Sequence, residues 1–281
     1  GMIRAHGLAV IVDAHPKSRV FRHMRDHPAI HEGFVHWWKT FAAHLAKTTD
    51  PEWVFLELLN EPGGQRYWAD DVWNEYQDRL ITVVRAAAPD HTLIINGGGY
   101  QLVSELDRAD PHPDRNTIWA VHFYEPSAFT HQGAVWMRTW YRPLRGVPWP
   151  FTAEALETTI AQLSGASSDR EAAARALRDL VARGYGTLEY LEQQIAAVAE
   201  WSQRHNRRVH VGEYGVIARA PRESRLRYLS ALNELFERHG LGRAIWNYSG
   251  SEFGIMSGDD EPGRRQPDDA LLAAIGLSRS R

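Results

Sequence analysis

Two glutamates, Glu61 and Glu213, each stand at the carboxyl end of a short apolar run, in the stretches LLNEPGG and VHVGEYGV. Carboxylates are costly to bury, so we expect the end of each run to face a polar pocket. Two carboxyl groups on one pocket are the minimal equipment for glycoside hydrolysis, in which one protonates the leaving oxygen and the other attacks the sugar or activates water. The pair therefore indicates acid–base chemistry on a sugar if the fold brings both positions together.

The elements that must position these residues are six short apolar, β-branched runs, each closed by small or polar residues. Such runs are typical of parallel strands that are buried on both faces. The runs span residues 8–16, 53–62, 92–100, 118–126, 209–216 and 244–250. The groups near their carboxyl ends are His15, Asn60 with Glu61, Asn96, His122 with Tyr124, Glu213 with Tyr214, and Trp246 with Asn247.

Segments of helical period lie between the runs; in one of them Phe34, Trp38, Phe41 and Leu45 share a face. Strands that alternate with helices predict an α/β fold, and a (β/α)8-type barrel would gather all the polar strand ends at one mouth. An open doubly wound sheet would also collect them at one edge. The stretch NGGGY at 96–100 lacks the G-x-G-x-x-G spacing of its phosphate turn, so we favour the barrel.

The fourth and fifth runs are much further apart than the others, and we interpret residues 127–186 as an insertion. Its first part, Ser127 to Phe151, is loop-like and rich in aromatic residues, whereas Ala153 to Arg183 is rich in alanine and predicted to be helical. We find neither an internal repeat nor a low-complexity linker. The sequence therefore predicts one catalytic domain over residues 1–281.

Composition excludes several classes of partner. A chain of 281 residues with 43% hydrophobic content can bury a large core, and its formal charge of −3 provides no basic stripe for nucleic acid or a membrane surface. No apolar run approaches the length of a membrane span, and no signal peptide is recognisable. The absence of cysteine excludes disulfides and thiol chemistry but leaves the compartment open.

The 14 histidines invite a metal site, but their spacing argues against one. His31 and His36 in HEGFVH are five residues apart, whereas the zinc helix H-E-x-x-H needs a separation of four. His23, His27 and His31 have that separation, but Pro28 interrupts the stretch. We therefore expect neither a metal nor another cofactor.

Three further acidic residues lie near the predicted mouth or strand ends, but we predict no catalytic role for them. Glu57 lies on the same side of its strand as Glu61, and we expect it to be a buried structural partner of an arginine or histidine rather than a third catalytic acid. Glu125 and Glu252 fall near the predicted mouth, but nothing in their spacing distinguishes them from loop charges.

The motifs LELLNEP, VHFYEP, VGEYGV and IWNYSGSEFGI, in this order after GLAVIVDAH, resemble the successive strand ends of glycoside hydrolase family 5, the cellulase-like retaining β-glycosidases. FTHQGAVW, residues 129–136, is similar to a loop in some bacterial endoglucanases of that family. The resemblance extends over residues 7–256. N-E-P alone is a weak signal, whereas the ordered set is specific.

The resemblance implies roles for the strand-end residues. Glu61 would be the general acid/base and Glu213 the nucleophile, with Asn60 binding the sugar 2-hydroxyl beside the reacting carbon. A retaining mechanism places the two carboxyl groups about 5–5.5 Å apart, against about 6.5–9.5 Å for inversion, and we predict the short distance.

The remaining implied contacts concern the substrate and the orientation of the nucleophile. His122 and Tyr124 match the family's H-x-Y and would contact substrate and orient the nucleophile. Tyr124 is also a candidate donor that keeps Glu213 ionised. His15 would line the subsite next to the cleaved bond, and Trp246 would be the sugar platform beneath it.

The resemblance begins late, because the family's first two strands should precede GLAVIVDAH. Two β/α units and an arginine beside the nucleophile are not found, and six strands cannot close an eight-stranded barrel. The runs that start at Leu8 and Ala244 would then have open edges, which invite pairing with another chain. We expect either a homo-oligomer that covers these edges or a distorted barrel with a wide cleft.

The function predicted from the sequence is hydrolysis of β-1,4-glucan or a related β-linked oligo- or polysaccharide by a two-glutamate double displacement. β-Mannanase and exo-β-glucosidase activities are the alternatives within the enzyme class. A carbohydrate-binding relic without turnover, or a truncated fragment of such an enzyme, is the alternative outside it. Family resemblance favours a secreted or periplasmic location, although the compartment stays unassigned.

Overall fold

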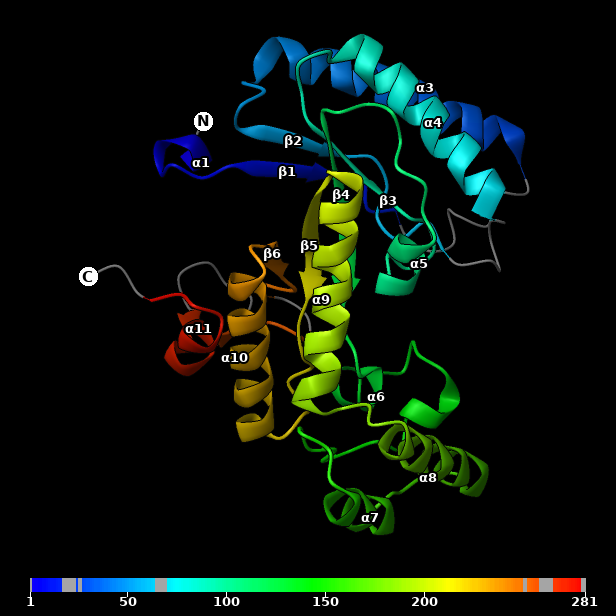
Figure 1. Cartoon of the computed structure of the whole chain (residues 1–281), viewed down its shortest axis with the longest axis vertical. Coiled ribbons are helices and arrows are strands. Elements are labelled where there is room, and N and C mark those ends of the chain that lie inside the picture. Colours follow the sequence, from blue (N-terminus) through cyan, green and yellow to red (C-terminus); the bar gives the residue numbers. More distant parts are fainter. Residues whose placement is uncertain are drawn as a thin grey trace. The chain divides into compact units, whose positions relative to one another are not determined.

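The computed structural model describes residues 2–16, 24, 27–63, 70–249, 252–257 and 265–278. Its main sheet contains six strands in chain order, and helices follow the strands (Figure 1). The chain thus forms the incomplete (β/α) barrel that the sequence predicts. The strands are β1 (Val10–Asp13), β2 (Val54–Glu57), β3 (Leu93–Asn96), β4 (Thr117–Phe123), β5 (Arg208–Tyr214) and β6 (Gly242–Ile245). Each overlaps one predicted run. A short apolar run therefore locates a strand of this sheet, but the predicted burial on both faces is wrong for β1 and β6, the first and last strands in the order, whose residues are half-buried or exposed.

The chain divides into two compact units, described here in turn; the prediction of a single domain stays a prediction. The first unit comprises residues 1–122 and 200–210. Its strands β1 to β4 pair in parallel, with Val10 opposite Val54 and Leu93 opposite Thr117. Its helices are α1 (Met2–Ala5), α3 (Pro28–Thr48), α4 (Asp70–Ala87), α5 (Val103–Asp107) and the last turns of α9 (Leu188–His205).

Helices α3 and α4 lie side by side in the first unit and anchor two strand ends (Figure 1). The indole N–H of Trp38 on α3 donates to the carbonyl of Leu58, just after β2, across 2.8 Å. The Gln77 side chain on α4 donates to the Asn96 carbonyl and accepts from the Asn96 backbone N–H, both at 2.9 Å. Buried polar groups must be paired, so these bonds fix where β2 and β3 end.

The buried face of α3 differs slightly from the predicted one. Val35, Trp38, Ala42 and Leu45 are buried, whereas Phe34 and Phe41 are half-buried. Both half-buried rings stack on Trp37, with ring centroids 5.6 and 5.1 Å away. Trp37 itself is 43% exposed. The helix therefore carries an aromatic stripe, Phe34, Trp37 and Phe41, beside the face that it buries.

The second unit comprises residues 123–199 and 211–281 and contains the predicted insertion. The aromatic part of the insertion holds α6 (Ser127–Thr130) and the 3-10 helix η1 (Thr139–Tyr141), and the alanine-rich part forms α7 (Ala153–Ala161) and α8 (Ser167–Ala182). Helix α7 begins where the Thr152 hydroxyl accepts from the Ala155 N–H. Helix α8 packs on α7 and on η1, so the insertion is a folded extension rather than a bare loop.

The remaining elements of the second unit follow β5. They are α10 (Arg222–Arg238), β6, β7 (Met256–Ser257), β8 (Gln266–Pro267) and α11 (Asp269–Ala274). Helices α10 and α11 lie side by side (Figure 1), and β7 pairs with β8 in antiparallel orientation. Asp268 caps α11 and also forms a two-point ion pair with Arg222 on α10, which joins the two helices.

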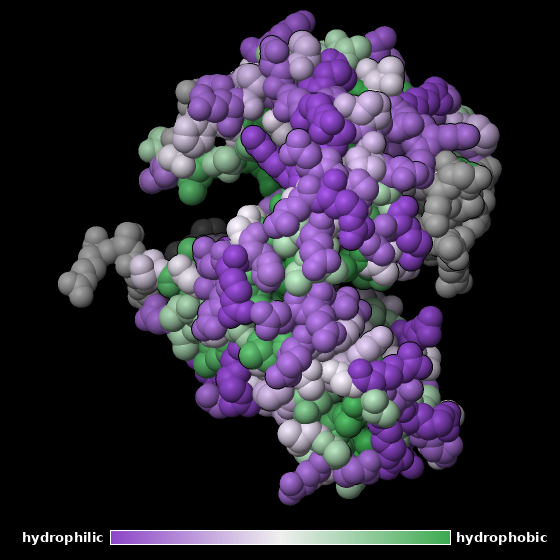
Figure 2. Space-filling model, in the orientation of Figure 1, coloured by the Kyte–Doolittle hydropathy of each residue, from purple (hydrophilic) through white to green (hydrophobic). Residues whose placement is uncertain are grey.

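The visible surfaces of α3, α4 and α9 are mainly hydrophilic (Figure 2), as expected for helices that bury one face only. Within the described residues, every helix is too short or too polar to cross a membrane.

Candidate active site

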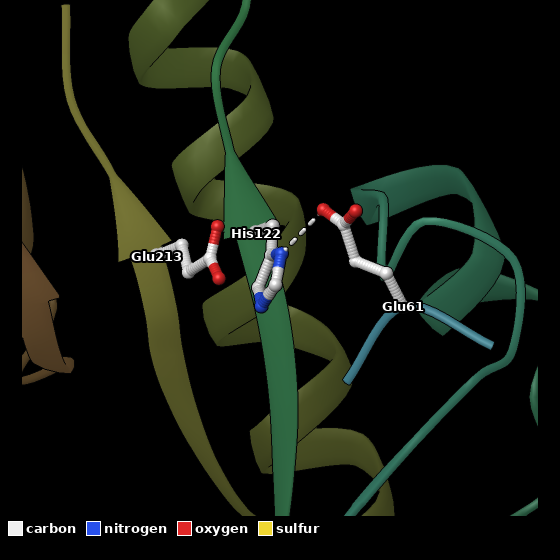
Figure 3. Close-up of side chains that lie close together, drawn as sticks. All are labelled: Glu61, His122 and Glu213. Atoms are coloured by element: carbon white, nitrogen blue, oxygen red, sulfur yellow. Dashed lines mark hydrogen bonds and ion pairs between the residues drawn. The ribbon is translucent and has the colours of Figure 1, made fainter. Parts of the chain in front are cut away.

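Glu61 follows β2, and its carboxylate meets an imidazole from β4. With Glu61 ionised, the Nδ1–H of His122 donates to Glu61 Oε1 across 2.8 Å (Figure 3). The His122 side chain is almost fully buried, whereas 32% of the Glu61 side chain is exposed. The φ angle of Glu61 is +36°, a left-handed conformation that costs a non-glycine residue about 1–3 kcal/mol. The fold therefore holds Glu61 against its local preference while leaving its carboxylate accessible.

Asn60 precedes Glu61 and belongs to a chain of three side chains. Its amide Nδ2–H donates to His15 Nε2 across 3.2 Å, so the proton of His15 sits on Nδ1. That Nδ1–H donates to Asp13 Oδ2 across 3.0 Å. Asn60 is 5% exposed, and its backbone N–H donates to the Ala14 carbonyl. Asn60 and His15, which the sequence predicts separately as substrate contacts, thus meet at the ends of β1 and β2.

Glu213 lies near the end of β5, and its carboxylate accepts a hydrogen bond from a phenol. The Tyr124 hydroxyl, just after β4, donates to Glu213 Oε2 across 2.9 Å. The Tyr124 ring meets the edges of His131 and Phe253, with centroids 4.9 and 5.9 Å away. Hydrogen bonds to the charged form of a carboxyl group favour that form. The arrangement therefore suits a carboxylate that must stay ionised.

Helix α6 fastens Tyr124 to the chain that follows Glu213. The buried Thr130 hydroxyl donates to the Tyr124 carbonyl across 2.6 Å, so the 2.9 Å bond to His131 Nδ1 has the imidazole as donor. The Thr130 carbonyl accepts from the backbone N–H of Ile217, four residues after Glu213. One buried threonine therefore joins the ends of β4 and β5 within the second unit.

Trp246 follows β6 and packs in the same unit as Glu213. Its backbone N–H donates to the Tyr214 carbonyl across 2.8 Å. A buried cluster of Ala134, Ile217 and Phe253 lies beneath it, and Tyr124 packs on the same cluster. The ring remains half-buried, as a sugar platform requires.

Removal of the Tyr124 hydroxyl tests its link to Glu213. We expect Tyr124→Phe to lower kcat/KM about 10–100-fold, because a hydrogen bond to a charged group contributes roughly 1.5–3 kcal/mol. The acidic limb of the pH profile should move to higher pH, because Glu213 loses a donor that stabilises its ionised form. Steady-state kinetics across pH check this, with Tyr185→Phe as the control. An unmoved acidic limb would contradict the assigned interaction.

Glu125 is an acid that the sequence did not resolve from loop charges. Burial raises its pKa, and the backbone N–H of Ser127 opposes this by donating to Oε2 across 3.3 Å. The Tyr228 hydroxyl donates to the Glu125 carbonyl, so the residue is enclosed in the second unit. Glu252, by contrast, forms an ion pair with Arg219. Glu57 is buried, and Gln101 Nε2 donates to its carboxylate across 3.4 Å.

The raised pKa of Glu125 makes a prediction about stability and pH. The unfolded chain ionises this carboxyl group at a lower pH than the folded chain does, so the contribution of Glu125 to folding stability falls as pH rises between the two pKa values. We expect Glu125→Gln to be more stable than the unchanged protein at pH 7, on the order of 1 kcal/mol, with a smaller gain near pH 4. Urea unfolding at both values checks this, with exposed Glu154→Gln as the control. An equal gain at both pH values would show that ionisation is not the cause.

Comparison with models of known protein families shows to which family the chain belongs. A model of the cellulase family, glycosyl hydrolase family 5, matches residues 1–252. The chain belongs to glycosyl hydrolase family 5. This confirms the resemblance carried by the ordered strand-end motifs.

The relatives of this family 5 chain include two endoglucanases. It is 28% identical over 223 residues to Endoglucanase 3 of Fibrobacter succinogenes, which covers 79% of this chain and 33% of that protein. It is 28% identical over 232 residues to Endoglucanase C of Acetivibrio thermocellus, covering 82% of this chain and 63% of that protein. The chain therefore spans between a third and just under two thirds of the length of these relatives.

Solved structures support the fold. The structure of Thermotoga maritima Cel5A in complex with cellobiose, in a mutant form, is 26% identical with a TM-score of 0.73, and the match covers 98% of this chain and 75% of that one. The same enzyme in complex with mannotriose is 25% identical with a TM-score of 0.71, covering 97% and 74%. The family 5 chain thus superposes over nearly its whole length on part of a larger fold.

The structure places the predicted site residues of this family 5 chain in two groups. Glu61 with His122, and Asn60 with His15, are hydrogen-bonded pairs of the first unit. Glu213, Tyr124 and Trp246 belong to the second unit. Sequence reasoning assigned no role to four residues that support these groups; the only signal for them was their place after a strand end, inside the FTHQGAVW loop or inside IWNYSGSEFGI. They are Gln101, Thr130, His131 and Phe253.

Proposed function

We propose that the chain hydrolyses β-1,4-glucan or a related β-glycan with retention of configuration at the anomeric carbon. The observation that carries the proposal is that each glutamate has a different donor, His122 for Glu61 and Tyr124 for Glu213. Two carboxyl groups in different surroundings suit two different roles. Membership of a cellulase family and the endoglucanase relatives support the choice of substrate class.

The proposed mechanism has two steps and needs both glutamates at one sugar, about 5–5.5 Å apart. In the first, a Glu213 oxygen attacks the anomeric carbon while Glu61 gives its proton to the glycosidic oxygen, so the carbon–oxygen bond breaks and a glycosyl ester forms. In the second, ionised Glu61 takes a proton from water, and the water oxygen attacks the same carbon and releases Glu213. Two inversions give overall retention.

The other predicted residues take supporting roles in this proposal. Asn60 binds the 2-hydroxyl of the reacting sugar through its amide, which His15 orients. A hydrogen bond to that hydroxyl strengthens in the transition state. His15 lines the neighbouring subsite, Trp246 is the sugar platform, and His122 holds Glu61 in place.

The purified protein should be assayed on carboxymethylcellulose, β-mannan and aryl β-cellobiosides, with the anomeric product followed by proton NMR at early times. We expect the β-anomer of the product to appear first. Release of long oligosaccharides, with a rapid fall in viscosity, would favour endo action over exo-β-glucosidase action. The mannotriose complex of the Cel5A neighbour is the reason to include mannan. Rates equal to the uncatalysed background on every substrate would refute the proposal.

A carbohydrate-binding protein without turnover is the second candidate. The observation that favours it is the six-stranded sheet, because a closed barrel of this type needs eight strands. Binding of cello-oligosaccharides measured by calorimetry, together with an absence of hydrolysis, would select this candidate over the enzyme.

We also propose that a second copy of the chain covers an apolar surface of the first unit. Strand β1 is the first strand in the sheet order, and Leu8 and Ile11 are 58% and 39% exposed. The aromatic stripe on α3, a second apolar feature of the first unit, exposes Trp37. Edge strands with exposed apolar side chains pair readily with another chain.

The oligomer is tested by light scattering coupled to size-exclusion chromatography. We expect a mass at or above that of a dimer, and we expect Ile11→Lys and Trp37→Lys to shift it toward the monomer. Leu188→Lys, at a residue of α9 in the second unit that is 45% exposed, is the control for Ile11 and Trp37, which are 39% and 43% exposed. A monomer at every concentration would rule out the second copy as the cover.

A further inference from the structure

The glycine-rich stretch NGGGYQ is a built turn rather than a loose loop, and it ends on a buried amide. Gly98 and Gly99 have φ angles of +88° and +58°, which side chains rarely adopt. A Cβ atom at Gly99 would collide with the carboxylate of Glu105, and one at Gly98 would press on the ring of Trp73. Glycine is therefore required because the turn packs closely against Trp73 and Glu105. The stretch has no phosphate-binding motif that would otherwise explain its glycines.

Side chains hold the turn from both ends. The Asn96 amide oxygen accepts from the Gly98 N–H across 2.9 Å. The Glu105 carboxylate accepts from the backbone N–H groups of Tyr100 and Leu102 at 2.9 and 2.7 Å. The residue between these two, Gln101, is thereby fixed in a left-handed conformation with φ +58° and is 1% exposed.

Gln101 reaches both members of the Glu61–His122 pair. Its side-chain Oε1 accepts from the backbone N–H of Glu61 across 2.7 Å, and its backbone carbonyl accepts from the N–H of His122, also across 2.7 Å. Its Nε2 donates to Glu57 Oε1 across 3.4 Å. Gln101 therefore joins the end of β2, through both ends of its side-chain amide, to β4, through its backbone carbonyl.

Two facts make this support necessary. Glu61 has a positive φ angle, and strained residues persist only where their surroundings over-determine them. A general acid must also lie within hydrogen-bonding reach of the oxygen that it protonates. We propose that Gln101 is a positioning residue that sets the place of the Glu61 carboxyl group for proton transfer. The inference rests on the proposed role of Glu61 as the acid.

Gln101→Met keeps the length of the side chain and removes both of its hydrogen bonds. Displacement of a catalytic group by about 1 Å costs on the order of 10²-fold, so we expect a loss of about 10–100-fold in kcat/KM on cello-oligosaccharides, whose sugar leaving group needs a proton. The loss in kcat/KM should be small on dinitrophenyl β-cellobioside, because kcat/KM reports formation of the glycosyl ester and this leaving group departs as an anion without a proton. A purely structural defect would lower both rates alike.

Two further variants sharpen the test. Gln132→Met removes another buried amide, which bonds to backbone groups of Phe129 and Val147 in the second unit, and should leave the ratio of the two rates unchanged. The double variant Glu57→Gln/Gln101→Glu exchanges carboxylate and amide and restores their mutual hydrogen bond. It should regain part of the rate on cello-oligosaccharides that Gln101→Glu alone loses.

An NMR measurement separates this inference from the proposed function. The Nδ1–H proton of His122 should give a downfield signal that Glu61→Gln alters, and Gln101→Met should shift the same signal even if no substrate is turned over. If the unchanged protein is inactive but the signal shifts, the proposed function fails and the positioning role stands. An unshifted signal, together with equal losses on both substrates, would overturn the inference.

Discussion

Glu213→Ala should lower kcat/KM on aryl β-cellobiosides by about 10⁴-fold or more, because loss of a nucleophile removes the covalent route and leaves only binding and residual electrostatic effects. The substitution also opens space beside the anomeric carbon at the face that Glu213 is proposed to attack. Added azide should enter that space, attack the carbon directly and restore part of the rate. A single displacement inverts configuration, so the product should be an α-glycosyl azide.

The control for this experiment is Glu234→Ala, an exposed glutamate on α10, which should keep most of the activity. Circular dichroism and urea unfolding show whether the Glu213 variant is folded. A β-glycosyl azide from Glu213→Ala, or undiminished hydrolysis, would remove Glu213 from the nucleophile's position. If azide restores the rate of Glu213→Ala but the glycosyl azide keeps the β configuration of the substrate, Glu213 would instead have a role in proton transfer.

The strands were predictable because each overlaps a short run rich in apolar residues, although the outer strands β1 and β6 contain no buried residue. β3, with four buried residues, is the clearest case. The helix face of α3 was predicted less well. Helical period places Phe34 and Trp38 on adjoining parts of one apolar surface, and only the packing against the sheet and α4 decides that Trp38 is buried while Phe34 stacks on Trp37.

The expectation that polar residues at strand ends face a pocket does not hold for every strand end. Asn96 also ends a strand, yet its side chain donates to the Leu59 carbonyl and accepts from the Gly98 N–H. It holds a turn rather than facing a pocket. The pattern of residue types cannot separate these two uses, because both satisfy a buried polar group.

Gln101 and Thr130 were beyond sequence reasoning for a different reason. Each acts through backbone groups of residues distant along the chain, Gln101 on Glu61 and Thr130 on Ile217. Backbone N–H groups and carbonyls are present at every position and leave no mark in residue type or spacing. The glycines before Gln101 were visible in the sequence, but their purpose depends on the approach of Glu105.

Glu61→Ala should show the opposite pattern to the nucleophile variant. Without a proton donor, we expect kcat/KM on cello-oligosaccharides to fall about 10²–10⁴-fold, the usual contribution of general acid–base catalysis. On dinitrophenyl β-cellobioside the glycosyl ester should still form, because this leaving group needs no proton. Its hydrolysis should then be slow, because water has lost its base, so a burst of dinitrophenolate followed by a slow steady rate is expected.

Azide distinguishes the two glutamates in this variant as well. It needs no base, so it should attack the accumulated glycosyl ester and raise the steady rate, and two displacements should give a β-glycosyl azide. Glu57→Gln is unsuitable as a control because Glu57 touches Gln101, so Glu52→Ala, in the exposed turn before β2, serves instead. If Glu61→Ala loses activity equally on both substrates and azide has no effect, Glu61 does not act as the acid. His122 would then hold Glu61 as a structural carboxylate, and another group would have to supply the proton.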